Sequence, residues 1–201
     1  KQTYFLRERQ YFESLEKAQN PKTLVVACCD SRVDPAILLH CKPGDLFVIR
    51  NVAALVPAVT QASNPCSVMS AIEYGVKHLN VEHIVVMGHS HCGGIHGLMA
   101  PETIAGETYI QDWVGIASPA LERLQAITGD EDEKTRSRHC EEGAVLISLD
   151  NLLSYPWIAE RVKNRQLKLH ALYYDLSEGN LYRFSPDSED FELLFHTIEN
   201  P

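Results

Sequence analysis

The chain has 201 residues, of which 45% are hydrophobic, so it is long enough for one domain (1–201) with a sizeable core. Its formal net charge of −9 argues against a nucleic-acid-binding protein, which normally presents a basic face. Apolar stretches fall short of the ~20 residues of a membrane-spanning helix, and the charged N-terminus is unlike a secretory signal.

Hydrophobic periodicity and turn residues predict helices that alternate with buried strands. In chain order we expect a helix over 4–19, ended by Pro21; a strand over 23–28; a helix over 34–41, with Asp34 as N-cap and Pro35 in its first turn; a strand over 46–51; a helix over 64–80; a strand over 83–90; a helix over 92–100; helical stretches over 112–127 and about 140–165; and two strands within 167–185, joined by a turn at 178–180. The charged stretch 129–139 reads as a solvated connection. This alternation predicts an α/β fold with a mainly parallel central sheet flanked by helices.

Functional sites in parallel sheets lie beyond the carboxyl ends of the strands. Cys28 ends the first predicted strand, and Gly88 and His89 end the third. Parallel strands place these two ends at the same edge of the sheet. We therefore expect Cys28 to meet the loop that follows the third strand.

That loop reads GHSHCGG over 88–94 and holds His89 and Cys92 three residues apart. With Cys28, they offer two sulfurs and one nitrogen, a set that zinc favours and that leaves a fourth position open. Plain core packing is the alternative for each residue taken singly. An anion cradle at a helix N-terminus is a second alternative, and His91 and His96 are further possible ligands.

Asp30 and Arg32 alternate with Cys28, so on an extended backbone all three project to one side, while Cys29 and Ser31 project to the other, where we expect Cys29 to be packed. A guanidinium next to a carboxylate lowers the pKa of that carboxylate and orients it. Beside a metal, an ionised Asp30 either accepts the proton of a metal-bound water or binds the metal itself. A plain ion pair is the alternative interpretation.

The chain contains six cysteines. A well-cored α/β protein does not need disulfides, so we expect reduced, buried or metal-bound thiols. This favours the cytoplasm or another reducing compartment; because the chain starts at Lys1, a removed leader is left open. A thiol redox protein built on Cys28 and Cys29 is disfavoured, because adjacent cysteines rarely form a comfortable disulfide.

Cys28-x-Asp30-x-Arg32, followed by His89-x-x-Cys92, resembles the β-class carbonic anhydrases, in particular their plant-like branch. The segments 43–53, 70–79 and 82–94 extend the resemblance in order and spacing. The resemblance implies reversible hydration of carbon dioxide to bicarbonate by one zinc ion per subunit, held by Cys28, His89 and Cys92. Zinc-bound hydroxide would attack carbon dioxide. Asp30 would orient this hydroxide, and Arg32 would hold Asp30.

The resemblance also implies a substrate pocket and a partner subunit. The pocket positions of the plant-like branch are occupied here by Gln19, Phe47, Val52 and Tyr74, and a suspected proton carrier by His78. An N-terminal helical arm, 1–20, would pack on a neighbouring subunit in a homodimer or homotetramer. One branch of the family has an inhibitory bicarbonate site that needs a Trp where this chain has Val25, which argues against that regulation.

Two other activities stay open at this point. The same zinc chemistry would serve a hydrolase of a related small molecule such as carbon disulfide. A non-catalytic zinc-binding module is the third interpretation, and a closed site with four protein ligands would support it. Smaller departures from the family pattern are Ala54, where Asn is frequent, and Cys29, where Ser is common.

Overall fold

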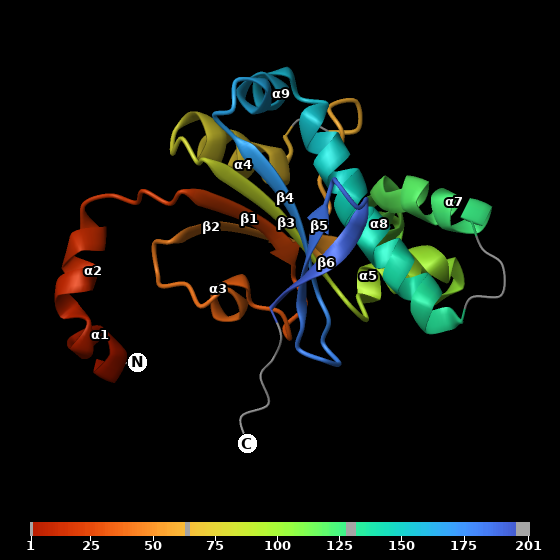
Figure 1. Cartoon of the computed structure of the whole chain (residues 1–201), viewed down its shortest axis with the longest axis horizontal. Coiled ribbons are helices and arrows are strands. Elements are labelled where there is room, and N and C mark those ends of the chain that lie inside the picture. The colour runs from red at the N-terminus through yellow and green to blue at the C-terminus, as the bar shows by residue number, and fades with distance from the viewer. Residues whose placement is uncertain (1, 63–64, 128–131, 196–201) are drawn as a thin grey trace.

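The computed structural model of the chain describes residues 2–62, 65–127 and 132–195. Its centre is a six-stranded sheet in the order β2-β1-β3-β4-β5-β6 (Figure 1). The strands are β1 (Thr23–Cys28), β2 (Leu46–Asn51), β3 (His83–His89), β4 (Lys168–Tyr174), β5 (Leu181–Ser185) and β6 (Asp190–Phe195). Strands β2, β1, β3 and β4 are parallel and β5 and β6 antiparallel, which confirms the predicted, mainly parallel sheet.

The register places the ends of β1 and β3 together at one edge. Cys28 pairs with Asn51 of β2, Ala27 pairs with Met87 of β3, and His89 pairs with Tyr174 of β4. All four strands are parallel, so their carboxyl ends share this edge, as the sequence pattern predicts. The segments that follow β1, β2 and β3 therefore meet there.

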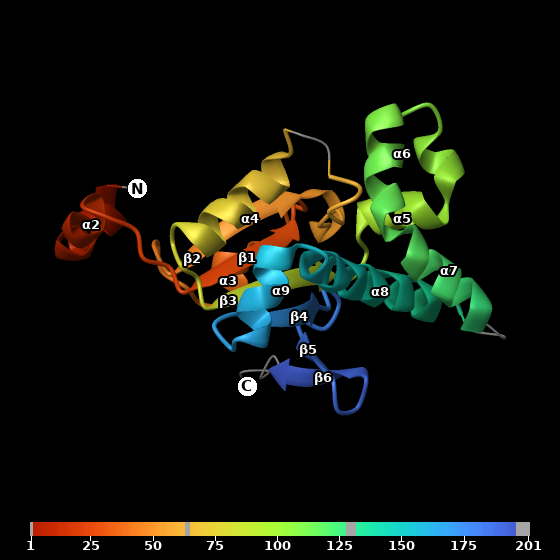
Figure 2. The ribbon, with the colours of Figure 1, turned by 90° about the horizontal axis from the view of Figure 1, so that it is seen from above.

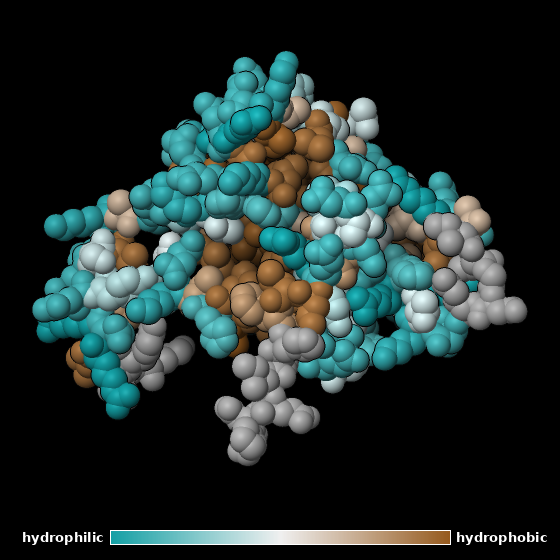
Figure 3. Space-filling model, viewed as in Figure 1, coloured by the Kyte–Doolittle hydropathy of each residue, from teal (hydrophilic) through white to brown (hydrophobic). Residues whose placement is uncertain are grey.

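The helices cover the sheet unequally (Figure 2). They are α1 (Gln2–Arg7), α2 (Arg9–Glu16), α3 (Pro35–Leu38), α4 (Ser67–Lys77), α5 (Gly93–Met99), α6 (Thr108–Val114), α7 (Ser118–Ile127), α8 (Glu133–Leu153) and α9 (Pro156–Lys163). Apolar side chains of α4, α8 and α9 pack on the face that carries Val26 and Val86. The opposite face is covered mainly by the α3 region, and apolar surface is visible there (Figure 3). Val48, on this less covered side, is 40% exposed.

The N-terminal helix forms, but it breaks at Glu8 and its second part, α2, ends at Glu16 rather than at residue 19. The Tyr11 hydroxyl donates to the carbonyl of Pro43 at 2.7 Å. Leu15 packs so closely on Gly44 that a Cβ at Gly44 would lie only 2.7 Å from Leu15 Cδ2. Gly44 has φ +96, so this turn requires glycine for its backbone as well as for this approach. Beyond these contacts the arm projects from the rest of the chain (Figures 1 and 2).

Several boundaries differ from the sequence prediction. The predicted helix over 112–127 begins earlier and is interrupted by a 3₁₀ turn at Gly115–Ala117, and the helix expected over 64–80 is Ser67–Lys77. The interpretation of 129–139 as a connection is wrong from Asp132 onward, because Asp132 caps α8 by accepting from the Thr135 amide at 2.8 Å. Residues 64 and 129–131 lie outside the described ranges.

Strand β6 has no counterpart among the predicted elements. It pairs with β5 at the edge of the sheet, and most of its residues are exposed. Among the described helices, none is both long and apolar enough to cross a membrane.

Candidate metal centre

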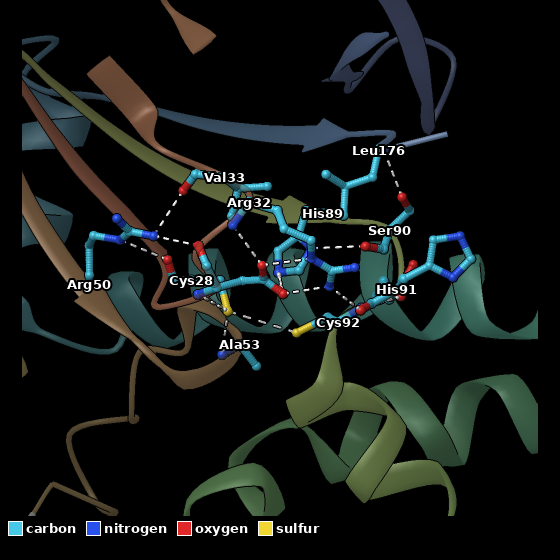
Figure 4. A network of polar contacts seen from close by, with 12 residues as sticks. Cys28, Arg32, Val33, Arg50, Ala53, His89, Ser90, His91, Cys92 and Leu176 are labelled. Carbon is cyan, nitrogen blue, oxygen red and sulfur yellow. Dashed lines mark hydrogen bonds and ion pairs between the residues drawn. The ribbon is translucent and has the colours of Figure 1, made fainter. Parts of the chain in front are cut away.

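Three candidate ligands meet at the shared strand edge (Figure 4). Cys28 ends β1, His89 ends β3, and Cys92 is the residue before α5. Their ligand atoms all lie within 4.8 Å of one another, and the two sulfurs are 4.0 Å apart. The three residues are only 5%, 2% and 3% exposed. The structure therefore brings together the three residues predicted from the sequence as a metal site.

His89 shows an unsatisfied nitrogen at this position. Its Nδ1 lies 2.9 Å from the carbonyl oxygen of Ser90, so Nδ1–H donates and the tautomer leaves a lone pair on Nε2. The buried Nε2 has no hydrogen-bond partner among the described residues. Buried nitrogens are rarely left unpaired, so a metal ion at Nε2 explains it. Two sulfurs and one imidazole nitrogen form a donor set that suits zinc.

The cysteine pair is electrostatically prepared for a cation. The neighbouring Cys92 thiol and the backbone N–H groups of Asp30 (3.4 Å) and Ala53 (3.3 Å) lower the pKa of Cys28. The same contact, together with burial, raises the pKa of Cys92. Two adjacent thiolates repel each other unless a cation lies between them. A divalent ion at this point would let both sulfurs ionise, and thiolates are the form that binds metals.

Asp30 and Arg32 form a two-pronged ion pair beside this cluster. Arg32 Nε donates to Asp30 Oδ1 at 2.9 Å, Arg32 Nη2 donates to Oδ2 at 2.6 Å, and the Arg32 amide also donates to Oδ1. These bonds hold the pKa of the Asp30 carboxyl well below its usual range. Oδ2 lies 3.9 Å from His89 Nε2. The carboxylate is thus oriented toward Arg32 while one oxygen still faces the ligand cluster.

The local backbone differs from the prediction. The chain turns after Cys29, with the Val33 amide donating to the Asp30 carbonyl at 3.2 Å, so Asp30 and Arg32 meet through a turn and not through extended alternation. Sequence reasoning also missed Arg50. Its guanidinium donates to the carbonyls of Cys28 (2.9 Å), Asp30 (2.6 Å) and Val33 (2.9 Å) and so fixes the shape of the turn (Figure 4). A charged residue near the end of the strand 46–51 was the available signal.

Cys29 is exposed, which corrects the expectation that it packs on the other side of a strand. Only its amide has a described role, donating to the Asn51 carbonyl at 2.8 Å. A serine keeps that amide and differs little in size. We expect Cys29→Ser to keep the metal content and the thermal stability of the wild type, measured by metal analysis and thermal unfolding. Loss of zinc in this variant would contradict the ligand assignment.

The predicted pocket residues divide into two groups. Val52 lies beside the metal centre, since a Cβ on Gly94 would be 2.6 Å from its Cγ1. Phe47 and Tyr74 contact each other, with ring centroids 6.1 Å apart, and His78 stacks on Tyr74 at 5.1 Å. Phe47 pairs with Leu24, four residues before the Cys28–Asn51 pair, which places it ~13 Å back along the strands. Gln19, exposed and ahead of β1, also lies at the end of the sheet away from Cys28.

Comparison with known proteins agrees with this arrangement. The sequence matches the family described as "Carbonic anhydrase" over residues 23–181. The chain belongs to the carbonic anhydrase family. It is 38% identical to beta carbonic anhydrase 5, chloroplastic, of Arabidopsis thaliana over 188 residues, which are 93% of this chain and 62% of that protein. It is 42% identical to beta carbonic anhydrase 3 of the same plant, over 84% of this chain and 66% of that protein.

Solved structures of β-carbonic anhydrases share the fold. The β-carbonic anhydrase CcaA superimposes with a TM-score of 0.90 at 30% identity, covering 95% of this chain and 92% of that one. A structure of tetrameric β-carbonic anhydrases of the ascomycete Sordaria macrospora superimposes with a TM-score of 0.76 at 31% identity, covering 91% of this chain and 90% of that one. The carbonic anhydrase chain described here is thus of the β class, and it spans less than two thirds of the length of the first two Arabidopsis relatives.

Proposed function

We propose that the chain is a zinc-dependent carbonic anhydrase that interconverts carbon dioxide and bicarbonate. The observation that carries the proposal is the buried, unpaired Nε2 of His89 within 4.8 Å of two cysteine sulfurs, next to an aspartate held by Arg32. The names of the similar proteins support the same activity.

Cys28, His89 and Cys92 would hold one zinc ion and leave the fourth tetrahedral position for solvent or substrate. When bound, zinc lowers the pKa of a coordinated water so that hydroxide is available near neutral pH. Asp30 Oδ2 faces this position and keeps a free lone pair, so it can accept the hydrogen of the attacking nucleophile and aim it at carbon dioxide. Arg32 keeps the carboxylate ionised and holds its orientation beside the three candidate ligands.

The presence of only three candidate ligands among the described residues favours catalysis over a closed zinc module. Both oxygens of Asp30 accept bonds from Arg32, which hold the carboxylate in place, so we propose that Asp30 acts as a neighbour of the metal and not as its fourth ligand. Val52 supplies apolar surface next to the ligands. Such a wall suits a small nonpolar molecule such as carbon dioxide.

The experiment is metal analysis combined with stopped-flow carbon dioxide hydration across pH. About one zinc per subunit and hydration that chelation removes would support the proposal. Stoichiometric zinc with no hydration at any pH would overturn it. In that case, turnover of carbon disulfide by the same preparation would identify the related hydrolase, and inactivity on both would indicate a non-catalytic zinc module.

The substrate pocket is completed by a second copy of the chain, as we propose from the separation of its residues. Gln19, Phe47 and Tyr74 lie at the other end of the strands from their own Cys28, so they would serve the metal centre of a neighbour. Phe5 and Leu6, on the projecting arm, are 49% and 65% exposed, which leaves an apolar face for that neighbour to cover. The Sordaria macrospora relatives described as tetrameric are consistent with a homodimer or homotetramer. His78, stacked on Tyr74, would then stand at the pocket rim as proton carrier.

Mixing two inactive variants tests this division. A mixed dimer contains one Asp30→Ala subunit and one Gln19→Ala subunit. At the metal centre of the Gln19→Ala subunit, its own intact Asp30 would meet the intact Gln19 of the Asp30→Ala subunit. We expect mixing with subunit exchange to restore hydration to about a quarter of the wild-type rate, the statistical share of such sites. No recovery would show that Gln19 serves its own metal centre. Sedimentation as a 22.6 kDa monomer at assay concentration would also contradict the proposal.

A reducing compartment such as the cytoplasm fits the cysteine chemistry. All six cysteines are free thiols in the structure. Two ligand thiols must stay reduced to bind zinc, and reducing compartments keep them so. The Arabidopsis relatives are named as chloroplastic in one case and mitochondrial in another.

A further inference from the structure

The peptide unit between His91 and Cys92 is held from both of its polar ends. Its carbonyl, on His91, accepts from Arg32 Nη2 at 3.1 Å (Figure 4). Its N–H, on Cys92, donates to Glu141 Oε1 at 3.0 Å. One peptide therefore joins the guanidinium that orients Asp30 to a carboxylate on α8.

This peptide lies in a turn that is conformationally costly. His91 has φ 57, the left-handed region that a residue with a Cβ adopts at an energetic cost. Such a backbone persists only where its surroundings fix it. The adjoining Ser90 is also held, since its hydroxyl accepts from the Leu176 amide at 2.8 Å and its own amide donates to the Tyr174 carbonyl.

Glu141 is built into the protein interior for this contact. It is 5% exposed, and its second oxygen accepts from the hydroxyl of Tyr173 at 2.7 Å. Tyr173 is fully buried, so the hydroxyl has little freedom to turn away. Burial of a carboxylate is unfavourable unless its oxygens are paired, and here both are.

The sequence of β3 allows α8 to come close enough. A Cβ on Gly88 would lie 2.4 Å from Val145 Cγ2 and 3.8 Å from the Glu141 carbonyl oxygen. Glycine at the position before the ligand His89 thus lets α8 pack directly on the strand end. Glu141 reaches the Cys92 amide because of this approach.

We propose that Glu141, oriented by Tyr173, is a positioning residue of the metal centre. Through the His91–Cys92 peptide it fixes the direction of the Cys92 sulfur, and through the carbonyl of the same peptide it supports Arg32 and hence Asp30. It touches neither metal nor substrate. The inference rests on zinc binding by the proposed site.

The test compares Glu141→Leu, which removes the acceptor, with Glu141→Gln. A glutamine can accept from the Cys92 amide and donate to the Tyr173 oxygen, so it keeps both contacts. Glu142→Leu is the matched control, because Glu142 is the next residue, also buried, and its described bond runs to Arg138. Two quantities are measured on purified, folded protein. The first is the rate of zinc release to a chelator, and the second is the thiolate-to-cobalt absorption of cobalt-substituted protein.

We expect Glu141→Leu to weaken metal retention about 10–100-fold and to shift the cobalt bands, as loss of a bond that orients a ligand does elsewhere. Glu141→Gln should lie close to the wild type, and Glu142→Leu should not shift the bands. Wild-type behaviour of Glu141→Leu, equal effects of both leucine variants, or a Gln variant as impaired as Leu would each overturn the inference.

Should Glu141→Leu fail to fold, Tyr173→Phe decides, since it removes one of the two bonds and keeps the carboxylate. Faster zinc release with shifted cobalt bands supports the inference, and unchanged release overturns it. Wild-type protein that binds no zinc at all would instead defeat the proposed function, so the two failures are distinguishable.

Discussion

Replacement of Cys92 by alanine is expected to abolish zinc binding and carbon dioxide hydration together. Cys92 is 3% exposed, its sulfur is 4.0 Å from that of Cys28, and no other described residue joins the ligand group. With one sulfur and one nitrogen left, the site has too few donors for a tetrahedral zinc site. Metal content after dialysis should fall from about one per subunit to near zero, and hydration to the buffer rate.

Cys29→Ser is the matched control for this experiment, since it removes an exposed sulfur next to a ligand. A folded Cys92→Ala protein that retains a full complement of zinc would show that the metal lies elsewhere. Thermal unfolding of both variants identifies any general loss of structure.

Asp30→Asn should give the opposite combination, with zinc retained and turnover lost. The asparagine has nearly the same shape, but its amide nitrogen cannot accept a hydrogen and its oxygen is a weaker acceptor. A positioned proton acceptor typically contributes 10²–10⁴-fold, so we expect kcat to fall at least ~100-fold. Zinc analysis and stopped-flow hydration on the same preparation measure both quantities.

Asp34→Asn makes the same chemical change four residues further on. Asp34 caps α3 by accepting from the amides of Ala36 and Ile37, and asparagine is an equally good cap. Its Oδ2 also lies 3.6 Å from Arg50 Nη1, but this ion pair is partly exposed and long, so we expect its loss to have little effect on the turn that Arg50 holds. This variant should keep zinc and hydration. Unchanged turnover in zinc-loaded Asp30→Asn would refute the role given to Asp30.

The sequence predicts the parallel core well because burial on both faces leaves a strong signal. The run Thr23–Cys28 is almost entirely apolar and β-branched, and its partner β3 is similar, so their existence and shared edge follow. The predicted start of helix α8, at about residue 140, is too late, because the first turns of the helix are charged and resemble a loop. Arg138 shows what the pattern hides: its charge pairs with Glu142 on the same helix while its guanidinium stacks on Tyr182 at 4.6 Å.

The residues of the candidate metal centre were predictable for a related reason, because the ends of β1 and β3 and the short loop after β3 set their positions. The sequence correctly predicts that Asp30 and Arg32 lie together, but the predicted extended backbone is wrong, because they meet across a turn. An alternating pattern does not show where a strand stops and a turn begins. The sequence pattern does not predict the roles of Glu141 and Arg50, because each contacts residues more than fifteen positions away along the chain. These contacts depend on how α8 and β2 pack against the rest of the fold. Such long-range contacts leave no local pattern.

The 4.0 Å separation of the Cys28 and Cys92 sulfurs also bears on handling of the metal-free protein. A disulfide needs the sulfurs about 2 Å closer, so the two side chains would have to move together before they could bond. One sulfur is already predisposed to ionise, so dioxygen would oxidise the pair once the ion leaves, two electrons passing to the oxidant. Zinc would then act as a protecting group, and demetallation in air would become irreversible until a reductant is added. Thiol titration of air-aged, chelated protein should find two fewer thiols than in the zinc-loaded protein; an equal count would refute this.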